Sequence, residues 1–249
     1  MMSLNKMDLS AAVKKQLNYK MKVYVGMFSS LVFVQVIGIF FSVVSPLQGY
    51  STMDYVEIEY MNYNTLNIIT LTSLWALIHA IIMTTKNEWE NAFPFVGNTL
   101  SNHLANMIFL VGASIVAGIV TILASFTVRV YLYYFTDERF VMSPGFVLNG
   151  GELLAGTVTV ILHFLLLCAV GYLLGTVTRL HRLLPVLLPI VVIGLLITIN
   201  YINHEWMMNT IDFYYGETSM AVFLMKIVVT AGILFACSIA ISSRTEVRK

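Results

Sequence analysis

The chain has 249 residues, of which 58% are hydrophobic and 11% charged, and its mean hydropathy is +0.82. A soluble domain carries roughly 25% charged residues, so this composition excludes an ordinary soluble enzyme and predicts an integral membrane protein. Fourteen Lys and Arg residues against thirteen Asp and Glu leave no basic surplus for nucleic acid, and two cysteines in apolar runs form no disulfide framework.

The first predicted element is an amphipathic helix that precedes the membrane spans and belongs to a cytoplasmic segment, residues 1–23. Its apolar residues recur every four positions, namely Leu9, Val13, Leu17 and Met21. Lys14 and Lys15 lie on other faces of the helix, as do two further lysines. An apolar stripe flanked by lysines is typical of a helix that lies on the inner leaflet of the membrane. A basic topology signal without a further role is the alternative interpretation.

Apolar stretches long enough to cross a hydrocarbon core of roughly 30 Å recur six times along the chain. They cover approximately residues 24–44, 65–83, 105–134, 153–176, 183–201 and 221–241. None alternates in the way that the strands of a membrane barrel do. The sequence therefore predicts an all-α polytopic protein, with a transmembrane domain over residues 24–242 and a cytoplasmic tail over 243–249.

The distribution of lysine and arginine predicts that both termini are cytoplasmic. In that orientation eleven of the fourteen basic residues lie inside, and Arg129, Arg139 and Lys226 lie outside. Glu152 lies at the same predicted level as Lys226 and Arg129 and is a candidate ion-pair partner for either. The outer loops, at about 45–64, 136–152 and 202–220, are too short to form a folded domain.

The predicted cytoplasmic stretch between the second and third spans has an unusual composition. Its core reads Lys86-Asn-Glu-Trp-Glu-Asn-Ala-Phe-Pro-Phe-Val-Gly97. Because Pro94 interrupts a helix, we expect a short helix within residues 86–97. Its aromatic residues predict burial against another protein. An interfacial hairpin that packs its rings into the leaflet is the alternative.

Sequence motifs for catalysis, cofactors and metals are missing. The chain contains no phosphate-binding Gly-x4-Gly-Lys-Ser/Thr loop, no His-Glu-x-x-His and no zinc-type spacing of His and Cys. Residues 112–115 resemble the serine motif of a six-helix intramembrane protease only loosely, because no glycine follows Ser114. We therefore expect no catalytic, cofactor-binding or metal site in this chain.

Two histidines and two glycines within the predicted spans are further candidates. His79 and His163 are ionisable groups inside the membrane, where they can line a path or relay a proton. A neutral histidine that is hydrogen-bonded to a neighbouring helix is the alternative for each. Gly171 and Gly175 form a small-x3-small face. Such a face suits either an internal helix contact or a dimer interface.

These features together resemble the permeases of bacterial ABC-2-type ABC exporters. Those chains have six helices, both ends inside, an amphipathic helix before the first span and a short coupling helix between the second and third. The coupling helix carries an acidic residue ahead of a Leu/Phe-Pro step, and Glu88-Trp-Glu-Asn-Ala-Phe-Pro-Phe-Val matches it. Gly175-Thr-Val-Thr-Arg179 matches the Gly-x3-Arg that ends their fourth span. Basic residues often follow the Pro step in the family, whereas residues 96–99 are neutral here.

The resemblance implies a transport subunit rather than an enzyme, located in the bacterial cytoplasmic membrane. ATP and Mg²⁺ would bind in a separate P-loop ATPase, present in two copies, and a second copy of this chain or a paralogue would complete the path. The residues implied in ATPase coupling are Glu88, Trp89, Glu90, Phe93, Pro94, Phe95, Lys14, Lys15 and Arg179.

The spans carry few charges and many Met, Phe and Tyr residues, which suits an amphipathic or hydrophobic cargo such as a toxic or antimicrobial peptide, a lipid or a drug. Among these, the resemblance to small exporters without an outer domain favours the peptide. Two alternatives belong to other classes of protein. One is a non-transporting immunity or sensor protein in the membrane. The other is an intramembrane enzyme, which would need a convergent group of polar residues.

Overall fold

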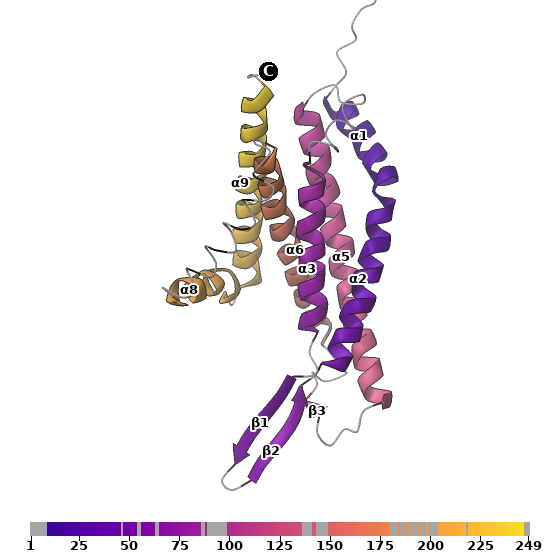
Figure 1. Ribbon diagram of the computed structural model, residues 1–249, viewed down its shortest axis with the longest axis vertical. Coiled ribbons are helices and arrows are strands. Elements are labelled where there is room, and N and C mark those ends of the chain that lie inside the picture. The colour runs from indigo at the N-terminus through magenta and orange to yellow at the C-terminus, as the bar shows by residue number, and fades with distance from the viewer. Residues whose placement is uncertain are drawn as a thin grey trace, which may run out of the picture. The chain divides into compact units, whose positions relative to one another are not determined.

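The chain is mainly helical, as the computed structural model in Figure 1 shows. The structure describes residues 9–45, 47–53, 56–62, 65–85, 88, 99–135, 141–142, 149–179, 184, 187, 190, 194, 198, 204–217 and 219–246. Within these ranges four helices are long and apolar enough to cross a membrane. They are α2 (Val25–Val44), α5 (Thr99–Phe135), α6 (Gly150–Thr178) and, over Met220–Ser243, α9 (Met220–Glu246). The chain is therefore a membrane protein.

Five of the six predicted spans coincide with helices, since α3 (Leu66–Ile82) is a further, shorter apolar helix. The remaining span, 183–201, lies outside the described residues except at five positions, each of which is helical: Leu184, Leu187, Ile190, Gly194 and Thr198. The six-span count and the side of the membrane on which the termini lie stay predictions. At the C-terminus, α9 continues into the predicted tail as far as Glu246.

The predicted N-terminal helix is present as α1 (Leu9–Val23), and a single turn residue, Tyr24, separates it from α2. Its burial pattern differs from a simple amphipathic interpretation. The buried positions are Ala12, Gln16 and Lys20, whereas Leu9 and Met21 of the apolar stripe are exposed. The helix therefore turns a largely polar face towards the protein.

All three predicted outer loops contain regular structure, and strands in two of them make the all-α prediction incomplete there. Within the predicted loop 45–64, β1 (Leu47–Met53) and β2 (Val56–Asn62) form a hairpin and run antiparallel from Leu47↔Asn62 to Met53↔Val56 (Figure 1). The short strand β3 (Val141–Met142) pairs parallel with β2, which gives the order β1-β2-β3. In the last loop, α8 (His204–Tyr215) precedes α9.

The chain divides into two compact units, and the division falls within α3, α5 and α6. The second unit comprises Val25–Trp75 and Ser114–Phe164. Its apolar core consists of Ile68, Ala124, Val128 and Leu132, against which Ile39 packs. One buried glutamine joins three of its helices. Gln35 Nε2 of α2 donates hydrogen bonds to Thr72 Oγ1 of α3, at 2.9 Å, and to Thr121 Oγ1 of α5, at 3.1 Å.

The first unit comprises Met1–Tyr24, Ala76–Ala113 and Leu165–Lys249. Here the Gly171/Gly175 face of α6 packs closely on the end of α3. A Cβ atom at Gly171 would lie 2.6 Å from the Leu77 carbonyl oxygen, and one at Gly175 would lie 2.8 Å from that of Ile81. Only glycine permits backbones to approach so closely. Of the two interpretations of this face, the structure therefore favours the internal helix contact.

Candidate coupling site

The candidate site lies in the first unit and begins at the junction of α1 and α2. Tyr24 OH donates a hydrogen bond of 2.6 Å to Glu88 Oε2. Glu88 is helical and partly buried, and it is the acidic residue that opens the predicted coupling segment. The Tyr24 ring also lies against Phe109 of α5, with 5.5 Å between ring centroids. Tyr24 therefore joins the start of α2, the segment containing Glu88 and the first half of α5.

Lys20, one turn before Tyr24, is buried although it is a lysine. Its side chain is 4% exposed, on the face of α1 that also buries Gln16. Burial lowers the pKa of the Lys20 ammonium to about 8, while the nearby Glu88 carboxylate acts in the opposite direction and raises it. Lys20 is thus a buried cation near the Tyr24–Glu88 contact, and the stability of its charge depends on how close the Glu88 carboxylate lies.

A second contact joins α1 to the start of α5. Gln16 Nε2 donates a hydrogen bond of 2.9 Å to Ser101 Oγ, and both side chains are buried. Buried polar groups in a membrane protein need such partners, because hydrocarbon offers none. Gln16 and Lys20, one helical turn apart, thus fix the orientation in which α1 meets the protein.

A third contact joins α5 to α6 around one tyrosine. His103 Nδ1 lies 2.6 Å from Tyr172 OH, and Asn106 Nδ2 donates to the same hydroxyl at 3.2 Å. All three side chains are almost completely buried. The Tyr172 ring meets Phe235 of α9 edge to face, with 5.5 Å between centroids. Tyr172 therefore couples three helices through one side chain.

Sequence reasoning missed this cluster because it began the third span at residue 105. The helix begins at Thr99 instead, so His103 lies inside it. The signal was the spacing, since Asn102 and Asn106 are four residues apart and His103 and Asn106 three apart. Polar residues at these separations share one helix face, which predicts a polar contact rather than a loop.

Arg179 lies at the end of α6, where the Gly-x3-Arg motif places it. Its Nη2 donates a hydrogen bond of 3.0 Å to Ser242 Oγ of α9. This contact joins the C-terminal ends of α6 and α9 in the same unit that contains Glu88. Arg179 is thereby a positioning residue for α9.

Of the other residues predicted for ATPase coupling, the structure describes two. Lys14 and Lys15 are exposed on α1. The remaining members lie outside the described residues: Trp89, Glu90, Phe93, Pro94 and Phe95. The coupling helix over 86–97 therefore stays a prediction, anchored at Glu88.

The two intramembrane histidines belong to different surroundings. His163 Nε2 lies 3.1 Å from Ser73 Oγ of α3, within the second unit. That contact is the interhelical hydrogen bond expected of a structural histidine. His79 is partly buried near the end of α3. A path-lining role for either residue stays a prediction.

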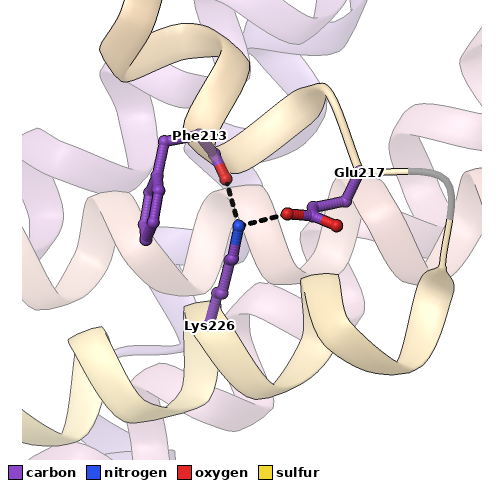
Figure 2. A network of polar contacts seen from close by, with 3 residues as sticks. All are labelled: Phe213, Glu217 and Lys226. Carbon is purple, nitrogen blue, oxygen red and sulfur yellow. Dashed lines mark hydrogen bonds and ion pairs between the residues drawn. The ribbon is translucent and has the colours of Figure 1, made fainter.

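A separate polar contact connects α8 to α9 (Figure 2). Lys226 forms an ion pair with Glu217 and donates a hydrogen bond of 2.8 Å to the Phe213 carbonyl oxygen. Its Nζ also lies 4.0 Å from the centre of the Phe213 ring, a cation–π distance. Lys226 thus pairs with Glu217, which follows α8 in the sequence; Glu152 belongs to the second unit, and its predicted pairing with Lys226 or Arg129 stays a prediction.

Among the residues that the structure describes, no three His, Cys, Asp or Glu side chains gather as metal ligands would. Comparison with known proteins adds no family, since no protein-family model, curated protein or solved structure matches the chain. The candidate site therefore consists of polar and charged contacts between helices of the first unit.

Proposed function

We propose that the chain is the membrane-spanning permease subunit of an ATP-driven exporter of the ABC-2 type. A separate P-loop ATPase, in two copies, supplies the energy. This chain, with a second copy of itself or a paralogue, forms the path for an amphipathic or hydrophobic substrate. The termini and the segment that contains Glu88 face the cytoplasm, where ATP is present.

The hydrogen bond between Tyr24 and Glu88 carries this proposal. Glu88 begins the segment that resembles a coupling helix, and Tyr24 is the residue between α1 and α2. A displacement of that segment by a closing ATPase dimer is passed directly to the first membrane-spanning helix. Rigid elements joined by specific polar contacts can carry such a movement between distant sites.

The remaining contacts of the first unit extend the movement to other helices. Gln16 joins α1 to the start of α5, and Tyr172 joins α5 to α6. Arg179 then joins the end of α6 to α9. Exposed Lys14 and Lys15 supply positive charge for docking on the ATPase.

The character of the second unit supports an apolar or amphipathic cargo. Its described buried polar side chains are all uncharged: Gln35, Ser42, Thr72, Ser114, Thr121 and Ser125. An interior of this kind has no fixed charge to recognise an ion or a charged metabolite. A toxic or antimicrobial peptide, which carries a large apolar surface, fits it best.

The proposal is tested with ATP-driven transport by the chain purified with its ATPase. Tyr24→Phe removes the donor and Glu88→Ala removes the acceptor of the same charged hydrogen bond, which contributes about 1.5–3 kcal/mol. We expect either variant to lower transport per ATP hydrolysed about tenfold, with the double variant no worse than either single one. Tyr134→Phe, at an exposed tyrosine of α5, is the matched control. Full coupling in both single variants would contradict the proposal.

The hairpin favours a second candidate, a non-transporting immunity or sensor protein. In the order β1-β2-β3, β1 lies at the edge of the sheet. An edge strand can pair with an extended peptide. On this candidate, cells would be protected by the chain without any ATPase, and deletion of residues 47–62 would abolish protection. Protection that needs ATP hydrolysis would contradict it.

A further inference from the structure

Helix α1 is too short and too charged to span a membrane, yet it has the polarity of a helix that contacts lipid. Its buried face contains Gln16 and Lys20, whereas Leu9 is 41% and Met21 57% exposed. A helix on the surface of a soluble protein shows the opposite arrangement, with its apolar stripe turned inward. Leu9 and Met21 are exposed and Val13 and Leu17 are half-buried, so the stripe is partly open to an apolar environment outside the protein.

Part of this stripe forms one wall of an open groove. Leu9, Val13 and Leu17 of α1 face Leu104 and Ile108 of α5 across a volume of about 550 Å³. Ligand-binding clefts typically have volumes of roughly 300–1,000 Å³. Both walls belong to the first unit. The groove is apolar apart from Ser10 and Lys14, as a hydrocarbon chain requires.

The charged residues of α1 are all basic. Lys14, an exposed residue, is the charged member of the groove lining. Residues 9–23 contain four lysines and no acid, and Asp8 is the acid next to them in the sequence. Basic residues beside a lipid-facing helix attract anionic headgroups, with a contribution of about 1 kcal/mol for each residue.

We propose that this groove binds one anionic phospholipid. An acyl chain lies between Val13 and Leu17 on one side and Ile108 on the other, and the phosphate of the headgroup lies beside the Lys14 ammonium. The site would fix α1 on one leaflet, in the orientation that buries Gln16 and Lys20. This proposal is independent of the exporter function, because it needs no ATPase and no transported substrate.

The test is native mass spectrometry of the full chain, released from nanodiscs that contain equal amounts of phosphatidylglycerol and phosphatidylcholine. We expect one retained phosphatidylglycerol per chain. Lys14→Gln should weaken its retention about fivefold, and Lys14→Arg should restore it. Val13→Trp, which fills the groove, should displace the lipid.

Two matched variants control for general effects of charge and bulk. Lys22→Gln removes an exposed lysine of α1 that does not line the groove, and Val32→Trp adds the same ring at an exposed position of α2. Both should retain the lipid as the wild type does. Equal retention of the two lipids, or a lipid that survives Val13→Trp, would overturn the proposal. So would a dimer that Val13→Trp disrupts, because a second copy would then occupy the groove.

Discussion

The consecutive helices α1 and α2 have the same pattern of burial but differ in charge. Both bury polar side chains and expose apolar ones. In α2, Gln35 is buried while Phe33 and Phe40 are more than half exposed. In α1, Gln16 and Lys20 are buried while Leu9 and Met21 are exposed. The two helices differ in charge, since α1 carries four lysines and α2 carries no charged residue.

That difference separates a helix that is long and apolar enough to span a membrane from one that is too short and too charged to do so. The buried glutamine of α2 donates to two neutral threonines, which suits the hydrocarbon core. The buried lysine of α1 lies near Glu88, outside the predicted spans, where a carboxylate and a cation are tolerated together. In α2, the buried Gln35 thus joins the helix to α3 and α5. In α1, the buried Lys20 lies near Glu88, in the segment that we propose receives an ATPase.

Neutralising Lys20 is expected to have the largest effect on stability. Burial lowers its pKa from 10.5 to about 8, so the folded state loses this proton before the unfolded state does. Below pH about 8 the charged lysine destabilises the folded chain, and stability rises as the pH increases from 8 to 10.5. The gain over this range should be on the order of 3 kcal/mol.

Denaturation of the wild type and of Lys20→Met in detergent, followed at several pH values, measures this effect. The variant should be more stable at pH 7 and should lose the rise in stability between pH 8 and 10.5. Lys22→Met, at an exposed lysine of the same helix, is the control and should keep the wild-type pH profile. A wild-type stability that stays flat across this range would contradict a buried, charged Lys20.

A smaller loss is expected where α6 packs on α3. In Gly175→Ala the new Cβ would lie 2.8 Å from the Ile81 carbonyl oxygen and would overlap with Thr84 Oγ1. Such overpacking destabilises a protein by about 1–3 kcal/mol. Thermal unfolding in detergent should show the loss. Gly156→Ala in the same helix meets no atom within 4 Å and should be neutral or stabilising; equal behaviour of the two variants would refute the close contact.

The smallest effect is expected at the glutamine of α2. Gln35→Leu removes the hydrogen bonds to Thr72 and Thr121, and interhelical bonds in membranes contribute about 0.6 kcal/mol each. Gln35 Oε1 is buried and has no hydrogen-bond partner among the described residues. Removing this unsatisfied oxygen therefore offsets part of the free energy lost with the two hydrogen bonds. We expect a destabilisation of about 1 kcal/mol or less in denaturant titrations. A loss as large as that of Gly175→Ala would show that polar contacts dominate α2 as they do α1.

The apolar segments could be predicted from the sequence because their length and hydropathy are local properties. The first predicted span, 24–44, and α2, Val25–Val44, agree within one residue. The helix of the third span, α5, begins at Thr99, six residues before the predicted start at 105. The prediction starts late because Ser101, Asn102 and His103 look like loop residues by composition. Their burial depends in part on Tyr172 from α6, a partner that no local pattern reveals.

The hairpin lies in a predicted outer loop, although its sequence contains a strand pattern. Val56, Ile58 and Tyr60 alternate with Glu57 and Glu59, a period of two that indicates a strand.

The inward face of α1 was harder to predict. The apolar stripe was recognised, but periodicity alone does not say whether a stripe faces protein or lipid. The Tyr24–Glu88 contact joins residues 64 positions apart and had no sequence signal beyond the resemblance at Glu88.

Affinity purification of the chain from its native membrane in mild detergent tests the central claim most directly. Co-purifying proteins would be identified by mass spectrometry, and ATP hydrolysis would be measured on the same sample. We predict one P-loop ATPase in stoichiometric amount, with ATP hydrolysis that is lost when residues 88–97 are replaced. A homogeneous chain without an ATPase, still active in its cellular role, would contradict the exporter function.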